Sequence, residues 1–114
     1  PDVVPGCRPR LPPMTLLESA PRFSISQVPP DGSALPLMEH FYTLQGEGAN
    51  AGRAAYFVRL GGCDVGCHWC DVKESWSAED HPLTSVAELV ALPAGAGAAG
   101  APVVVTGGEP ALYN

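Results

Sequence analysis

The sequence predicts an α/β fold, namely the N-terminal fragment of a partial (β/α) barrel over residues 37–114. Three stretches predict it. Residues 53–60 alternate with the two-residue period of a strand, residues 85–92 place apolar side chains at helical spacing, and residues 103–106 form a β-branched run typical of a parallel strand buried on both faces. In this order they make one βαβ unit. Because a parallel sheet of so few strands cannot cover both its faces, we expect the 114 residues to be part of a longer barrel-like chain.

Proline dominates the start of the chain. Nine of the 13 prolines lie in residues 1–36. Proline has no backbone N–H and fixes φ, so this density argues against a helix or a central strand. We therefore expect residues 1–36 to be an extended, disordered leader, with a proline-rich ligand for a partner protein as the functional alternative. Cys7 lies in this leader and is expected to be a bystander.

Residues 39–44 form a short apolar and aromatic run, which predicts a first strand or an edge element. The run leads into residues 45–48, Gln-Gly-Glu-Gly. Two glycines permit positive φ and a close approach of the backbone to a ligand. Taken alone, this pattern is equally typical of a tight turn.

The strand predicted at residues 53–60 places Tyr56, Val58 and Leu60 on one face and Arg59 on the other. An arginine inside a barrel is costly unless it pairs with an anion, which it can bind in fork geometry at the barrel mouth. The alternative is an arginine that reaches solvent or pairs with a nearby carboxylate. The closeness of the cysteine cluster described below favours substrate binding.

The predicted helix has recognisable ends. Ser85 and Glu88 are spaced as a capping box, and Pro93 is expected to stop the helix. Residues 94–101 alternate alanine and glycine, which predicts a flexible connector.

Composition excludes several functions. Six basic residues and a net charge of −6 argue against binding to nucleic acid, which requires clustered lysine and arginine. No apolar run approaches the roughly 20 residues that span a bilayer. A clustered cysteine trio is unlike the evenly spread framework of a secreted disulfide protein. The sequence therefore predicts a soluble cytoplasmic protein.

Three cysteines, Cys63, Cys67 and Cys70, lie within eight residues, and Gly66 lets the chain curl between them. Thiolates at this density suit zinc or an iron–sulfur cluster. Three ligands leave one metal position open for a substrate or cofactor, as in catalytic zinc sites. The zinc alternative adds His68 as a fourth ligand, although its place between two thiols makes a common tetrahedron difficult to reach.

A second motif, Gly107-Gly108-Glu109-Pro110, directly follows the strand predicted at residues 103–106. Pro110 suits the first turn of a helix. The cysteines follow the other predicted strand of the βαβ unit. In α/β folds the carboxyl ends of parallel strands form the ligand-binding edge, so we expect the two motifs to meet there.

These residues carry a family resemblance. The cysteine loop, with Trp69 before its last cysteine, resembles the cluster loop of radical S-adenosylmethionine enzymes, and residues 107–110 resemble their methionine-binding motif. Residues 44–48 are similar to one family of that superfamily, which converts 6-carboxy-5,6,7,8-tetrahydropterin to 7-carboxy-7-deazaguanine in queuosine biosynthesis. The resemblance covers residues 39–114 and implies a barrel of the radical S-adenosylmethionine type.

The resemblance implies a four-iron four-sulfur (4Fe-4S) cluster on Cys63, Cys67 and Cys70, with S-adenosyl-L-methionine bound to the remaining iron. An electron from the cluster would cleave the sulfonium bond to give a deoxyadenosyl radical, so the cofactor performs the difficult step. The residues expected along the S-adenosylmethionine are Trp69, Cys70, Asp71, Gly108 and Glu109.

The implied substrate is the carboxylated pterin, whose ring contracts with loss of ammonia, the reaction of a carbon–nitrogen lyase. Arg59 would bind its carboxylate, and Thr106 its ring or carboxyl group. The residues expected to bind the substrate are Leu44, Gln45, Gly46, Glu47, Arg59 and Thr106. Many family members supply a hydroxyl to a magnesium ion where this chain has Val72, which has no lone pair. The ion would then be held only by substrate and waters, or not be needed.

Two further alternatives remain at this stage: an activase of a glycyl-radical enzyme, and a fragment that binds a cluster or zinc without turnover. The first also has a three-cysteine loop, but residues 45–48 and the place of Arg59 favour the pterin enzyme. The partners that the resemblance implies are the pterin, an electron donor such as flavodoxin, and a second copy of the chain in a homodimer.

Overall fold

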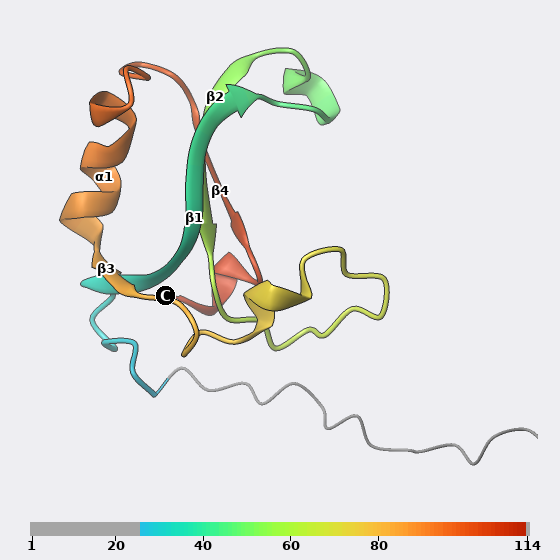
Figure 1. The fold of residues 1–114 in the computed structure, drawn as a ribbon, viewed down its shortest axis with the longest axis vertical. Helices are drawn as coiled ribbons and strands as arrows, with labels where there is room; N and C mark the ends of the chain where they lie inside the picture. Colours follow the sequence, from blue (N-terminus) through green and yellow to red (C-terminus); the bar gives the residue numbers. More distant parts are fainter. Residues whose placement is uncertain (1–25, 114) are drawn as a thin grey trace, which may run out of the picture.

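The computed structural model describes residues 26–113 as a mixed four-stranded sheet with one helix on one face (Figure 1). Strand β2 runs parallel to β4, whereas β1 is antiparallel to both β2 and β3. Helix α1 lies in the connection from β2 to β4, so the α/β class and the parallel pair are confirmed. The elements are β1 (Ala34–Leu44), β2 (Ala54–Leu60), β3 (Leu83–Ser85), α1 (Val86–Gly95) and β4 (Val103–Gly107), and the strand order is β3-β1-β2-β4.

The core lies between the sheet and α1. Tyr56, Val58 and Leu60 are buried on the face of β2 that packs against Leu89 and Ala98. The alternation read from the sequence is therefore confirmed. The opposite face of the sheet carries the paired side chains Glu39 and Arg59 and the stacked rings of Phe41 and Phe57. The cysteine loop lies on the side of the sheet away from α1 (Figure 1).

Helix α1 begins with the predicted capping box. The Ser85 hydroxyl accepts a hydrogen bond from the Glu88 N–H at 3.2 Å, and the Glu88 carboxylate accepts one from the Ser85 N–H at 3.1 Å. The prediction that Pro93 stops the helix is wrong, because the helix continues to Gly95. Proline forfeits one backbone donor, but its own carbonyl still accepts from the Ala98 N–H at 2.8 Å, which helps to close the last turn.

The first strand is longer and more central than the sequence indicates. It begins at Ala34 and lies between β3 and β2, so it is neither a short run nor an edge. Pro36 is buried, and its carbonyl accepts a hydrogen bond from the Gly61 N–H at 2.9 Å. The leader therefore cannot extend to Pro36, although the disorder expected for residues 1–25 lies outside the described residues.

Strand β4 is not buried on both faces in the described part of the chain. It is the outer strand of the sheet, and the side chains of Val103 and Val105 are 49% and 57% exposed. Helix α1 packs on one face only, and no described strand pairs with the free edge of β4. Within residues 26–113 there is also no helix with the length and apolar character that a membrane crossing requires.

Candidate active site at the carboxyl end of the parallel strands

The cysteine loop, residues 61–76, begins where β2 ends and projects from the sheet (Figure 1). Backbone hydrogen bonds join its two stems: the Gly62 N–H donates to the Ser75 carbonyl at 2.7 Å, and the Cys63 N–H donates to the Trp76 carbonyl at 3.1 Å. Ser75 is fully buried, and its hydroxyl donates to the Val72 carbonyl at 2.6 Å. The base of the loop is therefore held in place by backbone bonds and by one buried hydroxyl.

All three predicted cysteines and the predicted glycine motif line one pocket of about 140 Å³. Cys63 is buried, Cys67 and Cys70 are half-buried, and none of the three forms a disulfide. The complete lining is Cys63, Val65, Cys67, Cys70, Ser75, Trp76, Gly107, Gly108 and Glu109. Two motifs that lie more than 35 residues apart in the chain therefore meet, as their places after β2 and β4 predict.

Gly107 and Gly108 can lie this close to the cysteine loop only because they have no side chains. A Cβ on Gly108 would overlap the Gly62 carbonyl oxygen and lie 2.9 Å from the Ser75 oxygen. A Cβ on Gly107 would overlap the Leu60 carbonyl oxygen. The Glu109 N–H donates to Gly62 at 2.8 Å, so backbone bonds join the end of β4 directly to the cysteine loop.

The metal-ligating side chains that line the pocket include three cysteine thiols. Among residues 26–113, no three His, Cys, Asp or Glu side chains are grouped as ligands of one metal ion. A zinc site needs its ligands to converge on one point, whereas the thiolates of a 4Fe-4S cluster each bind a different iron. Three free thiols, the ligand type of an iron–sulfur cluster, line one pocket, and His68 is not among the residues that line it.

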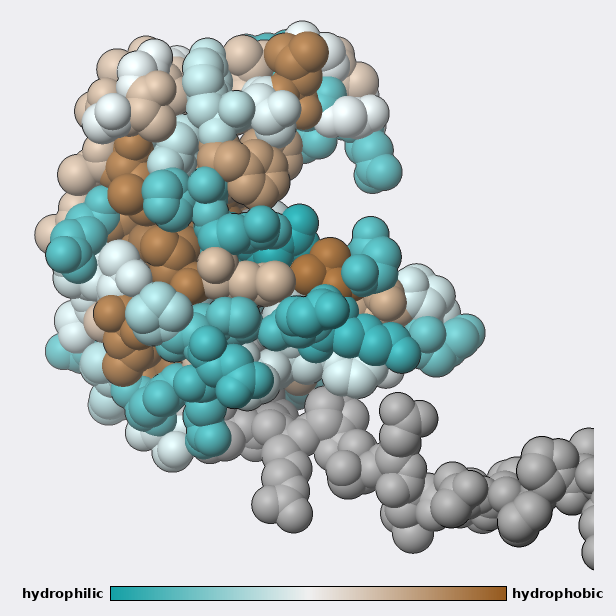
Figure 2. Space-filling model, viewed as in Figure 1, coloured by the Kyte–Doolittle hydropathy of each residue, from teal (hydrophilic) through white to brown (hydrophobic). Residues whose placement is uncertain are grey.

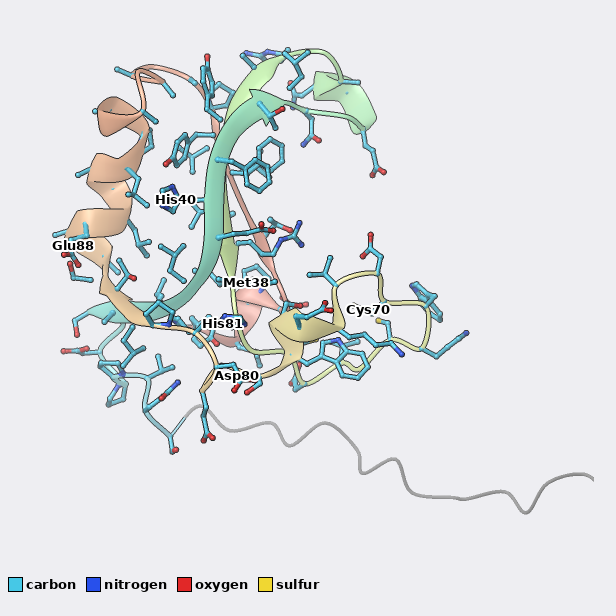
Figure 3. The ribbon with its side chains drawn as sticks, in the orientation of Figure 1. Met38, His40, Cys70, Asp80, His81 and Glu88 are labelled. Atoms are coloured by element: carbon cyan, nitrogen blue, oxygen red, sulfur yellow. The ribbon has the colours of Figure 1, made fainter. Side chains whose placement is uncertain are left out.

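The other predicted cofactor residues lie outside the pocket lining. Trp69 is 73% exposed and packs edge-on against His68, and Asp71 is exposed. Figure 3 shows Cys70 on the part of the loop that projects away from α1 and its Glu88. The Glu109 carboxylate lines the pocket, and its Oε1 accepts a hydrogen bond from the Ala111 N–H at 2.8 Å.

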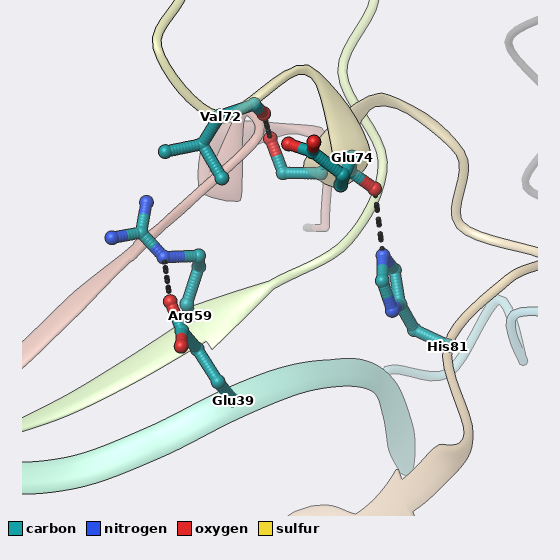
Figure 4. A network of polar contacts seen from close by, with 6 residues as sticks. Glu39, Arg59, Val72, Glu74 and His81 are labelled. Carbon is teal, nitrogen blue, oxygen red and sulfur yellow. Dashed lines mark hydrogen bonds and ion pairs between the residues drawn. The ribbon is translucent and has the colours of Figure 1, made fainter.

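Arg59 and Thr106 are neighbours across β2 and β4, one residue pair before Leu60 and Gly107. Arg59 also pairs with a carboxylate, since its Nε donates to Glu39 Oε1 at 2.6 Å (Figure 4). The nearby carboxylate considered as the alternative partner of this arginine is therefore present as Glu39, but it binds only the Nε edge of the guanidinium.

The predicted substrate residues 44–47 lie at the other end of the sheet. Leu44 pairs with Ala54 at the start of β2, so about 17 Å of strand, at roughly 3.3 Å per residue, separates it from Arg59. Figure 2 shows the surface hollowed between the turn after β1 and the cysteine loop. Residues 44–47 and the cysteine pocket therefore lie on opposite sides of this hollow and do not touch.

Sequence reasoning missed the residues that support the loop. The Tyr113 hydroxyl donates to the Gly61 carbonyl, and burial raises the pKa of this tyrosine. His81, which looks isolated in the sequence, donates through Nε2 to the Glu74 carbonyl at 2.9 Å (Figure 4). A Cβ on Gly61 would overlap the His81 ring. The only sequence signal for these contacts is the glycine pair before Cys63.

A cysteine trio and a glycine pair share one pocket at the carboxyl end of the parallel strands, which is the arrangement that the resemblance to radical S-adenosylmethionine enzymes implies. No family model matches the chain. The chain is 58% identical over 83 residues to the 7-carboxy-7-deazaguanine synthase of Flavobacterium psychrophilum, and this match covers 73% of this chain and 38% of the relative. It is 52% identical to the synthase of Prochlorococcus marinus, over 72% of this chain and 37% of the relative. Over nearly three quarters of its length, the chain is therefore similar to 7-carboxy-7-deazaguanine synthases.

A solved structure of a related protein has a similar fold. The crystal structure of QueE from Escherichia coli superposes with a TM-score of 0.62 at 36% identity, and the match covers 71% of this chain and 44% of that one. The chain thus spans less than half the length of the relatives that it matches.

Proposed function

We propose that the protein containing this chain is a 7-carboxy-7-deazaguanine synthase, a carbon–nitrogen lyase of the radical S-adenosylmethionine class. It converts 6-carboxy-5,6,7,8-tetrahydropterin to 7-carboxy-7-deazaguanine in queuosine biosynthesis. The observation that carries the proposal is the single pocket lined by three free cysteines and by the Gly-Gly-Glu motif. The names and identities of the relatives support the same activity.

The residues present fit a 4Fe-4S cluster and S-adenosylmethionine. Cys63, Cys67 and Cys70 would hold the cluster, and Gly108, which lines the same pocket, would lie beside the methionine end of the cofactor. When bound, the cluster supplies the electron that cleaves the sulfonium bond. The Glu109 carboxylate, oriented by the Ala111 N–H, is available to accept hydrogen bonds from the methionine ammonium.

On the sheet face, Arg59 and Thr106 would bind the substrate. The guanidinium supplies paired N–H donors for the pterin carboxylate, and the Thr106 hydroxyl can donate to the same group or to the ring. Leu44, Gln45, Gly46 and Glu47 would contact the pterin edge from across the hollow that Figure 2 shows. Asp71 and Trp69 would contact S-adenosylmethionine from the outer part of the cysteine loop.

Magnesium has less support. The side chain of Val72 offers no oxygen, and its carbonyl already accepts hydrogen bonds from both the Ser75 N–H and the Ser75 hydroxyl. A magnesium ion near Val72 would therefore rely on substrate and waters. A flavodoxin-like electron donor, which would reduce the cluster, and a second copy of the chain in a homodimer complete the proposal.

The test uses the full-length protein, reconstituted with iron and sulfide without oxygen. The purified protein is supplied with S-adenosylmethionine, a reductant and the carboxypterin, and 7-carboxy-7-deazaguanine is measured by mass spectrometry. We expect product from the wild type and none from Cys67→Ala, which should also lose iron. Arg59→Ala should keep its iron but bind the carboxypterin more weakly.

Three outcomes would contradict parts of this proposal. A reconstituted protein that binds its cluster yet yields no product from the carboxypterin would exclude the synthase activity. Turnover by Cys67→Ala would exclude the cluster assignment. Unchanged carboxypterin affinity in Arg59→Ala would remove the carboxylate role of that residue while leaving the rest in place.

A further inference from the structure

Strand β1 contains an irregularity that aims one carboxylate at Arg59. Leu37 pairs with Leu60, but Glu39 pairs with Arg59, so Met38 is an extra residue that breaks the register. Leu37 packs against the core with α1, whereas regular alternation would place Glu39 on that same apolar face. The bulge turns Glu39 to the other face instead. Bulges are common beside active sites, where they re-aim a side chain in this way.

The result is a row of three polar side chains across β1, β2 and β4. Glu39 pairs with Arg59, and Arg59 pairs with Thr106. The row lies one residue pair before the end of β2, where the chain enters the cysteine loop. It therefore lies on the route from the open face of the sheet to the cysteine pocket.

The ion pair constrains the arginine and leaves much of its binding capacity free. Glu39 accepts from Nε at 2.6 Å and is the one described partner of the Arg59 side chain. Figure 4 shows the terminal nitrogens on the side of the guanidinium away from the Glu39 backbone. The side chains of Arg59 and Glu39 are 21% and 45% exposed, and so exposed a pair adds little to folding stability.

We propose that Glu39 is a positioning residue for substrate recognition, an inference that rests on the synthase function proposed above. Its carboxylate holds Arg59 Nε, so that the two terminal nitrogens face the open side as a preformed fork for the substrate carboxylate. Its negative charge also repels a second carboxylate from the Nε edge. The substrate carboxylate is thus directed to one side of the guanidinium, which sets the orientation of the pterin.

The experiment compares Glu39→Ala and Glu39→Gln with Glu79→Gln in the full-length reconstituted protein. Glu79 is an exposed glutamate outside the sheet and serves as the matched control. Carboxypterin affinity is measured by equilibrium dialysis without turnover, and KM and kcat are measured separately. Iron content and the thermal unfolding midpoint report on folding.

We expect Glu39→Ala to weaken carboxypterin binding and raise KM by about tenfold, the loss of one charge-assisted bond. Its kcat, iron content and unfolding midpoint should match those of Glu79→Gln. Glu39→Gln should recover part of the affinity, because its amide oxygen still accepts from Nε. In an Arg59→Lys background, which has no guanidinium to orient, Glu39→Ala should add no further loss.

Affinity in Glu39→Ala equal to that of the control, or an equal loss in the Arg59→Lys background, would overturn the positioning role alone. A fall in iron content or in unfolding midpoint that matches the loss of affinity would also overturn it, in favour of a structural role. If the wild type binds no carboxypterin, the proposed function and this inference both fail, and the dialysis shows this before any variant is compared.

Discussion

At the scale of single residues, the pocket depends on the absence of a side chain at Gly108. Gly108 lies against Gly62 and Ser75 at a distance that no other residue type permits, and this contact joins the end of β4 to the cysteine loop. The sequence identifies Gly108 as a cofactor residue by resemblance. Its second task, the backbone contact, becomes visible only in the fold.

We predict that Gly108→Ala lowers the free energy of unfolding by about 1–3 kcal/mol, the usual cost of forcing extra volume into a packed site. Cluster content should fall with it, because the loop must move away. Gly95→Ala is the matched control: a Cβ there meets nothing within 4 Å, and Gly95 lies in α1. Chemical denaturation and iron analysis measure both effects. A Gly108→Ala protein with unaltered stability and iron would contradict the close contact.

Tyr113 gives a prediction that depends on pH. Burial raises its pKa above the ordinary value of 10.0, so the folded protein keeps this proton to higher pH than the unfolded chain does. The contribution of Tyr113 to the free energy of unfolding is therefore complete below about pH 10 and is lost as the pH rises above that value. Tyr113→Phe should lack this alkaline loss and, at neutral pH, be less stable by about 1 kcal/mol for the missing bond to Gly61. Chemical denaturation of the wild type and Tyr113→Phe at pH 7 and above pH 10 tests both expectations. A stability difference between the two proteins that stays the same at both pH values would contradict the prediction.

At the scale of elements, α1 depends on its N-terminal cap more than on its composition, since it contains Pro93 and ends in a glycine-rich segment. The capping box was predictable because it is a local pattern of two residues. The continuation past Pro93 was not, because the last turn is closed by bonds from residues 96–98 whose positions depend on the connector folding back.

Ser85→Ala should therefore lower the free energy of unfolding by about 1 kcal/mol. The Ser85 hydrogen bonds hold the pKa of Glu88 below its ordinary value of 4.5, so their contribution is present above that pH and is lost as pH falls. The difference between wild type and Ser85→Ala should shrink in acid, as measured by denaturation at pH 7 and pH 3. Thr84→Ala, one residue earlier, serves as the control, and an equal loss in that variant would refute a specific cap.

At the scale of the whole molecule, periodicity and motif order were enough to predict the α/β class and the meeting of the cysteines with the glycine motif. Both follow from local patterns and from the rule that parallel strands share an edge. The antiparallel pairing of β1, the bulge at Met38 and the Glu39–Arg59 pair could not be predicted, because they depend on a register set by distant contacts. For the same reason, burial of β4 was over-predicted from a valine run that the described residues leave half open.

The most direct test of the account is iron and acid-labile sulfide content in the anaerobically reconstituted full-length protein. We predict about four of each per chain in the wild type and in Cys7→Ser, as a 4Fe-4S cluster requires, and loss of both in Cys63→Ser, Cys67→Ser and Cys70→Ser. Zinc bound in place of iron by the wild type, or a full cluster retained by any of these three variants, would contradict the claim that this pocket is a cluster site.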